Sequence, residues 1–174
     1  SNAGLGRTYG AEVLLRKSLT RNFYAWLSYT LSRGELRDVP GADFNVVDFD
    51  QTHILTLIGS YKFPRNWQLG ARFRLVSGNP TTPIVNGAFD SETGAYRCIE
   101  GPRNSDRIKT FHQLDLRVDK RWYAKRAEIS LYLDIQNAYN RRNVEFRNYA
   151  FNCQSFQPVT GLPIIPSIGT RIEF

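Results

Sequence analysis

The chain has 174 residues, with 3 Trp, 9 Tyr, 11 Phe and no Met, which suits one domain. Apolar residues make up 41%, yet no run approaches the roughly 18 that a membrane helix needs. The net charge of +7 does not indicate nucleic-acid binding, because the basic residues lie on separate turns without a recognition motif. A globular domain or a membrane β-barrel, whose strands carry a weak signal, remains.

The first three residues, Ser1-Asn2-Ala3, are typical of the scar left by tag removal and are set apart from the fold. After them, apolar and polar residues alternate with period two, which predicts strands with one apolar and one polar face. Seven such segments follow in chain order, at about 7–18, 22–33, 52–63, 67–75, 114–119, 128–135 and 164–174.

The connections between these segments alternate in length. Short ones lie near 19–21, 64–66 and 123–126, and long ones span about 34–51, 78–110 and 138–163. Because an antiparallel meander then has all its short turns at one end, the pattern predicts an all-β, up-and-down sheet like that of outer-membrane barrels. The expected strands run to roughly 10–13 residues, which is long enough for a tilted strand to cross a bilayer.

The expected short-turn end is rich in aromatic and basic residues. The rings favour an interfacial belt over ordinary strand aromatics, and belong to Phe23, Trp26, Tyr61, Phe63, Trp67, Trp122, Tyr123 and Phe174. Contact with anionic lipid head groups and plain solvation are equally good explanations for the cations, which are Arg16, Lys17, Arg21, Lys62, Arg65, Lys120, Arg121, Lys125 and Arg126.

The polar face of the strands carries the main candidate site. By parity it faces the lumen of a barrel, and it comprises Arg72, Arg74, Asp115, Arg117, Asp119, Glu128, Tyr132, Asp134, Arg171 and Glu173. Two functions are open for this set. The charges form salt bridges that hold the strands in register, or they contact a plug domain or line a substrate path.

The expected long loops are the other candidate region, since loops on a rigid scaffold often bind ligands. The 34–51 loop is acidic and suits a cationic ligand or divalent ions, although solvated charge is the default. Cys98 and Cys153 fit no metal-ligand spacing, and a disulfide between them would join two of these loops. His53 and His112 are isolated on strands, and no catalytic constellation, cofactor motif or metal site is recognisable.

Two stretches carry a family resemblance. The last strand, 167–174, reads SIGTRIEF, and Gly169, Ile172 and Phe174 stand in the pattern of the terminal signal that the barrel-assembly machinery reads. Upstream, DLRVDKRW at 115–122 followed by LYLDIQNAYN at 131–140 is similar to the penultimate hairpin of TonB-dependent receptors, and DQTHILTL at 50–57 resembles another strand of that family.

The resemblance implies that 4–174 are the carboxy-terminal part of an outer-membrane β-barrel without its plug domain. The parent would import a scarce, unknown small ligand across the outer membrane of a Gram-negative bacterium, coupled to TonB through the plug. An odd count of seven strands also indicates a fragment, unless 144–151 is an eighth strand rather than an extension of a hairpin. A fragment would be a partial or small closed barrel with edges that invite self-association.

Two other functions are kept as alternatives. One is a complete small outer-membrane barrel that acts as a pore or an adhesin. The other is a soluble, lipocalin-like barrel, in which the apolar face would turn inward around a ligand.

Overall fold

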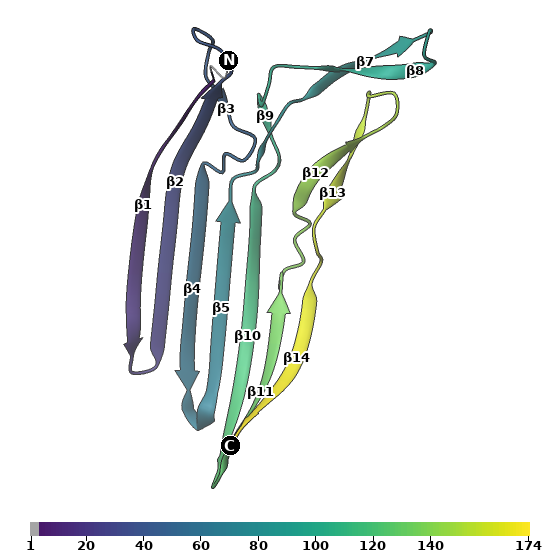
Figure 1. Ribbon diagram of the computed structural model, residues 1–174. Helices are drawn as coiled ribbons and strands as arrows, with labels where there is room; N and C mark the ends of the chain where they lie inside the picture. The colour runs from purple at the N-terminus through teal and green to yellow at the C-terminus, as the bar shows by residue number, and fades with distance from the viewer. Residues whose placement is uncertain (1–3) are drawn as a thin grey trace.

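The computed structural model of the protein describes residues 4–174, so the expected tag scar at 1–3 lies outside the described residues. Seven long strands form one antiparallel sheet, adjacent in chain order (Figure 1). They are β1 (Leu5–Thr20), β2 (Phe23–Arg37), β4 (His53–Phe63), β5 (Trp67–Val76), β10 (Phe111–Ala124), β11 (Ala127–Gln136) and β14 (Ile165–Glu173). The predicted all-β, up-and-down architecture is confirmed.

The three short connections all lie at one end of the sheet, near the carboxy terminus (Figure 1). Two-residue turns join β1 to β2 and β10 to β11, and a helical turn, η1 (Pro64–Asn66), joins β4 to β5. Arg21, Arg65 and Asn66 adopt positive φ values of 54°, 61° and 62°. This left-handed backbone reverses the chain within two or three residues.

The long connections fold into small two-stranded ladders at the other end, which we call the outer end. These are β6 (Pro80–Thr81) with β9 (Asp106–Arg107), β7 (Ile84–Asp90) with β8 (Ala95–Glu100), and β12 (Val144–Tyr149) with β13 (Phe156–Thr160). A further strand, β3 (Asn45–Val46), pairs with the outer end of β2. Since β12 pairs with β13 alone, 144–151 extends a hairpin and is not an eighth strand of the wall.

The main sheet is open. Within residues 4–174, β1 pairs only with β2, and β14 pairs only with β11. The fold is therefore a partial barrel wall, and the alternative of a small closed barrel is wrong for this chain. The described residues include no helix long and apolar enough to cross a membrane.

Strand register sorts the side chains onto two faces. Leu57 lies opposite Phe73, which lies opposite Leu114, so one row of the sheet is apolar across three strands. On the other face, Arg72 lies opposite Asp115. The same division runs through all seven strands, because residues that lie opposite each other on neighbouring strands point to the same face of the sheet.

The apolar face is not covered by other elements. Among the described residues, Val76 and Cys153 are the only buried hydrophobic residues, and Leu69 and Leu131 remain 40% and 37% exposed. The accessible surface is 12477 Å², whereas a compact chain of 20.0 kDa exposes about 8,700 Å². No sealed, dry centre holds these leucines, as a lipocalin-like barrel would require.

Aromatic residues at the short-turn end divide between the faces. Cross-strand pairing places five of them on the apolar face, namely Phe23, Tyr61, Phe63, Trp67 and Trp122. Trp26 and Tyr123 have the opposite parity, since they pair with Ile58 and Glu128. The expectation that all these rings form one belt is wrong for these two, because register sets the face and proximity to a turn does not.

Candidate functional site

The most densely bonded group on the polar face surrounds Asp115 of β10, which is only 8% exposed. Its carboxylate accepts hydrogen bonds from Arg72 Nη2 at 2.6 Å, from Gln113 Nε2 at 2.6 Å and from the Asn137 backbone N–H at 2.9 Å. One carboxylate thus links three neighbouring strands, β5, β10 and the end of β11. The arrangement fixes the relative position of these strands at the point where β11 ends.

Asn137 also belongs to the Asp115 group, although the alternation of polar and apolar residues did not predict it. Its φ is 53° and its side chain is 2% exposed. The side-chain amide donates to the carbonyls of Arg141 and Leu162, and its oxygen accepts from the Arg141 N–H. It therefore closes the turn after β11 over the Asp115 group. The only signal in the sequence was its place in the family-like motif at 131–140.

A second group lies nearer the short turns and is centred on Arg117. The guanidinium is 2.9 Å from Asp119 and 3.8 Å from Asp134, and it lies 4.1 Å above the ring of Tyr132. Tyr132 in turn covers Gly169 of β14, where an added Cβ would come within 2.4 Å of the ring. Arginine, ring and glycine form one stack across β10, β11 and β14.

The remaining predicted charges also lie on this face. Arg171 pairs with Glu173, and Arg121 lies 3.7 Å from Glu128. Arg74 forms no ion pair within residues 4–174 and instead lies 5.6 Å from the ring of Phe111.

A polar hollow of about 290 Å³ opens on the polar face around Arg117. It is lined by Arg117, Asp119, Arg121, Glu128, Ser130, Tyr132, Arg171 and Glu173. Three cations and three anions balance in it, so it offers donors and acceptors in equal measure.

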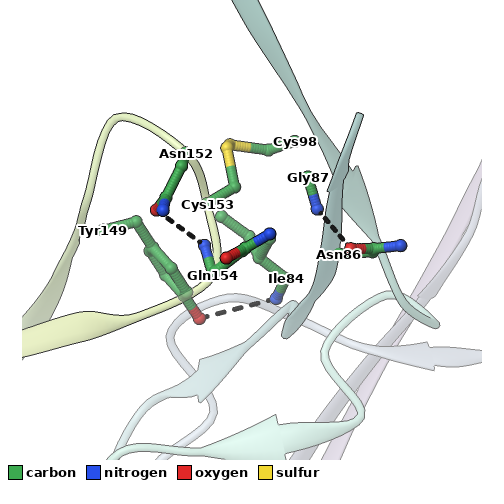
Figure 2. Close-up of a disulfide and its surroundings, with 8 residues drawn as sticks. All are labelled: Ile84, Asn86, Gly87, Cys98, Tyr149, Asn152, Cys153 and Gln154. Atoms are coloured by element: carbon green, nitrogen blue, oxygen red, sulfur yellow. Dashed lines mark hydrogen bonds between the residues drawn. A yellow bond between two sulfur atoms is a disulfide. The ribbon is translucent and has the colours of Figure 1, made fainter. Parts of the chain in front are cut away.

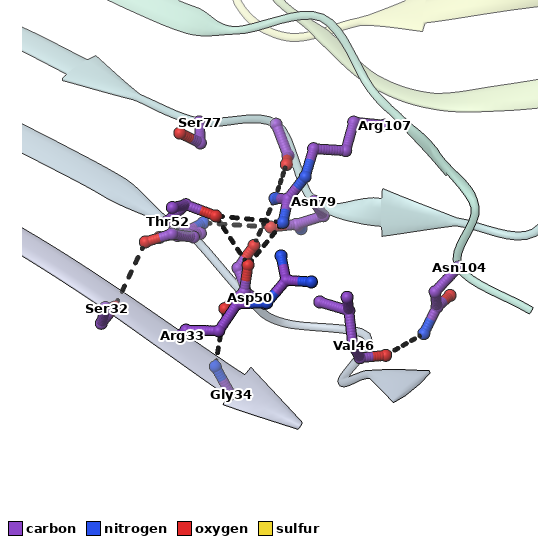
Figure 3. A network of polar contacts seen from close by, with 12 residues as sticks. Ser32, Arg33, Gly34, Val46, Asp50, Thr52, Ser77, Asn79, Asn104 and Arg107 are labelled. Carbon is purple, nitrogen blue, oxygen red and sulfur yellow. Dashed lines mark hydrogen bonds and ion pairs between the residues drawn. The ribbon is translucent and has the colours of Figure 1, made fainter. Parts of the chain in front are cut away.

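At the outer end, Asp50 is the centre of a second network (Figure 3). Its buried side chain accepts hydrogen bonds from Arg107 Nη2 at 2.5 Å, the Gly34 N–H at 2.8 Å and Thr52 Oγ1 at 2.8 Å. Burial by itself would raise the pKa of Asp50, but these hydrogen bonds outweigh it and hold the pKa below its usual range. Arg107 thereby fastens the 78–110 loop to the 34–51 loop.

Further polar contacts tie the same loops. Arg103 lies 3.1 Å from Asp38, and Asn104 donates to the Val46 carbonyl at 2.7 Å. Arg147 of β12 binds Asp106 at 2.7 Å, and this hydrogen bond lowers the pKa of the Asp106 carboxyl. The acidic residues of the 34–51 loop are thus partly used as anchors for arginines. Among the described residues, no cluster of three metal-ligating side chains occurs.

A disulfide joins two of the outer hairpins (Figure 2). Cys98 on β8 and Cys153 in the β12–β13 turn are bonded, with their Cα atoms 5.4 Å apart. Gly87, opposite Cys98 on β7, lets the chains approach, since an added Cβ would lie 2.0 Å from the Asn152 carbonyl oxygen. Beside the disulfide, the exposed rings of Phe89 and Phe151 flank Tyr96.

The two histidines mark the outer edge of the apolar face. His53 lies 2.8 Å from the Tyr29 hydroxyl, and His112 lies 2.7 Å from the Tyr139 hydroxyl. Both histidines share the parity of the apolar rows, since they pair with Leu31 and Leu75. Two tyrosine–histidine pairs thus lie at the outer end of this face.

Comparison of this fold with solved structures identifies outer-membrane receptors. The chain aligns over 95% of its length with the ferripyoverdine receptor of the outer membrane of Pseudomonas aeruginosa, bound to ferripyoverdine, at 15% identity and a TM-score of 0.61. It aligns over 95% with a chain of the FpvAI–pyocin S2 complex, at 16% identity and a TM-score of 0.59. In both cases it spans 19% of the other chain, about a fifth of its length.

No protein-family model and no curated protein sequence matches the chain. The similar structures are receptors of the TonB-dependent class that the sequence motifs resemble. The chain therefore has the fold of a segment of the barrel wall of such receptors.

Proposed function

We propose that this chain is a wall segment of a TonB-dependent receptor that imports a scarce ligand across the outer membrane of a Gram-negative bacterium. One observation carries the proposal: seven strands in continuous register separate an exposed apolar face from a charge-paired polar face. Likeness to a wall segment of outer-membrane receptors supports it.

In lipid each backbone polar group needs an internal partner, and strands paired on both sides supply it. The exposed leucines and rings would be unfavourable in water, so the apolar face is assigned to lipid. The polar face, with Arg72, Asp115, Arg117 and Asp134 paired among themselves, is assigned to the receptor interior.

We assign the interior charges two further roles. Groups that offer both donors and acceptors, such as the hollow around Arg117, suit contact with the plug domain, through which TonB would act. Arg74, which has no carboxylate partner among the described residues, suits a place on the substrate path. The ligand remains of unassigned chemistry, and the outer loops are the first surface it would meet.

The final strand is proposed to carry the signal for the barrel-assembly machinery. Phe174 is fully exposed and Ile172 is 54% exposed, so both are accessible to a partner. Gly169 also has a structural role beneath Tyr132. Deletion of Phe174 should therefore reduce insertion into the membrane without changing the isolated fold, whereas Gly169→Val should disturb both.

Neighbouring positions on β11 test the assignment of the faces in the full-length receptor. Ser130 lines the polar hollow and Leu131 is exposed on the apolar face, while the two native cysteines are consumed in the disulfide. In isolated outer membranes, a water-soluble maleimide should label Ser130→Cys and spare Leu131→Cys. Both variants should react after denaturation, which controls for expression. Labelling of Leu131→Cys as fast as Ser130→Cys in intact membranes contradicts the proposal.

A further inference from the structure

A shallow groove of about 590 Å³ crosses the apolar face near the short-turn end. Its floor consists of small side chains, Ala25 of β2, Gly59 of β4 and Ala71 of β5, which lie opposite one another in a single row. Larger side chains stand beside this row and form the walls, among them Phe23, Leu27, Leu57 and Phe73. The groove is therefore a break in an otherwise bulky surface.

The backbone does not require a glycine at position 59. An added Cβ would find the Tyr24 carbonyl oxygen as its nearest neighbour at 3.9 Å, which is ordinary contact. Gly59 also has no left-handed φ that would favour glycine. Packing within the protein therefore does not explain why residue 59 lacks a side chain, whereas a molecule bound in the groove would explain it.

A cation stands at the end of the same row. Lys17 of β1 lies opposite Ala25, and its Nζ is 5.6 Å from the ring of Phe23. Within residues 4–174 no carboxylate pairs with Lys17, and the same holds for the nearby Arg16 and Arg21. An apolar trough that ends at an ammonium group matches a molecule with a hydrocarbon chain and an anionic head.

The rest of the short-turn end is also positively charged. Six more basic residues at this end are Lys62, Arg65, Lys120, Arg121, Lys125 and Arg126, and only Arg121 among them approaches a carboxylate of the described chain. Lys120 lies 5.2 Å and 5.7 Å from the rings of Trp67 and Trp122, so its ammonium group is held at the level of the belt. Aromatic rings settle at head-group depth, which places Lys120 beside lipid phosphates.

We propose that the groove binds one acyl chain of an anionic phospholipid, whose phosphate contacts Lys17. This inference rests on the proposed function, because it takes the apolar face to be the lipid-facing one. It adds a defined site and a head-group preference to that general contact. Each basic residue near an anionic membrane surface strengthens attraction by about fivefold.

Native mass spectrometry of the purified chain in detergent tests the site, with phosphatidylglycerol and phosphatidylcholine of identical acyl chains in equal amounts. The wild type should retain one phosphatidylglycerol in preference to phosphatidylcholine. Lys17→Gln should lower this preference by about fivefold, while Lys125→Gln, on a turn remote from the groove, should leave it unchanged. Gly59→Leu should lower retention of both lipids, and Thr170→Leu on the apolar face of β14 serves as its matched control.

Equal retention of the two lipids by the wild type overturns the proposal, and so does an equal effect of Gly59→Leu and Thr170→Leu. Gly59→Ala, with far-ultraviolet circular dichroism as a check on the sheet, covers the case in which leucine prevents folding. A separate measurement isolates the proposed function: brominated phosphatidylcholine should quench Trp67 and Trp122, which lie on the apolar face. Quenching without lipid preference removes the groove site alone, and absence of quenching removes the lipid-facing assignment itself.

Discussion

The two ends of the sheet use charged residues in opposite ways. The long segments 34–51, 78–110 and 138–163 carry ten acidic and eight basic residues, so their net charge is −2. Because the whole chain has a net charge of +7, the rest of the chain carries +9. At the outer end, arginines join loops, as Arg107 does with Asp50 and Arg147 with Asp106. At the short-turn end, cations such as Lys17 and Lys125 lack carboxylate partners within the described residues.

The difference follows from the length of the connections. A two-residue turn is fixed by its own backbone, so its side chains are free to meet a partner. A long loop has much conformational entropy to lose and has little apolar core here to offset it. Ion pairs, the Asp50 network and the Cys98–Cys153 disulfide supply that order instead. The charged residues of the outer end thus bind one another, whereas those of the short-turn end are available to bind a partner.

The largest effect should come from the disulfide, whose partners are 55 residues apart. The chain-entropy relation assigns a closed loop of this size about 4 kcal/mol. Replacing both cysteines by serine should therefore raise hydrogen exchange in β7–β8 and β12–β13, with little change in β4 and β5. An equal rise in the central strands would show that the two ends are not independent.

Asp50→Ala should have the next largest effect. The change leaves the Arg107 guanidinium and the Gly34 N–H without their buried acceptor, and breaking such a group costs about 3 kcal/mol. Urea unfolding of the detergent-refolded chain measures it. Asp43→Ala is the matched control, because Asp43 is exposed on the same loop and forms no ion pair within residues 4–174.

Acidification should loosen the outer end. The pKa values of Asp50 and Asp106 are lowered from the ordinary 3.8, so the folded state binds fewer protons than the unfolded state. Their stabilisation is then fully present above the unfolded pKa and is lost as pH falls through the lower folded values. Carboxyl carbon chemical shifts recorded from pH 6 downward should place both midpoints below the ordinary 3.8. A midpoint for Asp50 at or above 3.8 contradicts the network.

The smallest effect is expected at the short-turn end. Lys125→Gln and Arg126→Gln together should change the free energy of unfolding by no more than about 0.5 kcal/mol, because neither side chain forms an ion pair within residues 4–174. The same urea titration measures it. A loss comparable to that of Asp50→Ala would mean that these cations hold the fold and are not free for a lipid.

The sequence placed four of the seven strands closely and left the other three too short. The segments expected at 52–63, 67–75, 128–135 and 164–174 differ from β4, β5, β11 and β14 by at most one residue at each end. The segments expected at 7–18, 22–33 and 114–119 are shorter than β1, β2 and β10, which extend two to five residues beyond them at one or both ends. There the strands lengthen because their neighbours offer hydrogen bonds, which a local pattern does not record.

For the candidate site, parity placed the charges of the polar face correctly on one side, but it did not reveal which of them pair. Asp115 collects Arg72, Gln113 and the Asn137 backbone because the register brings β5 and the end of β11 to the same point. Trp26 was assigned to the belt from its nearness to a turn, and the register moved it to the opposite face. Both outcomes depend on which residues lie across from each other.

The amino-acid order alone determined that these strands have two unlike faces, since side chains alternate along any extended chain whatever its neighbours. Tertiary structure decided how the outer loops meet. Arg107 reaches Asp50 across 57 residues, and Cys98 reaches Cys153 across 55. Such contacts arise only after the sheet has brought distant segments together, and no local pattern of polarity encodes them.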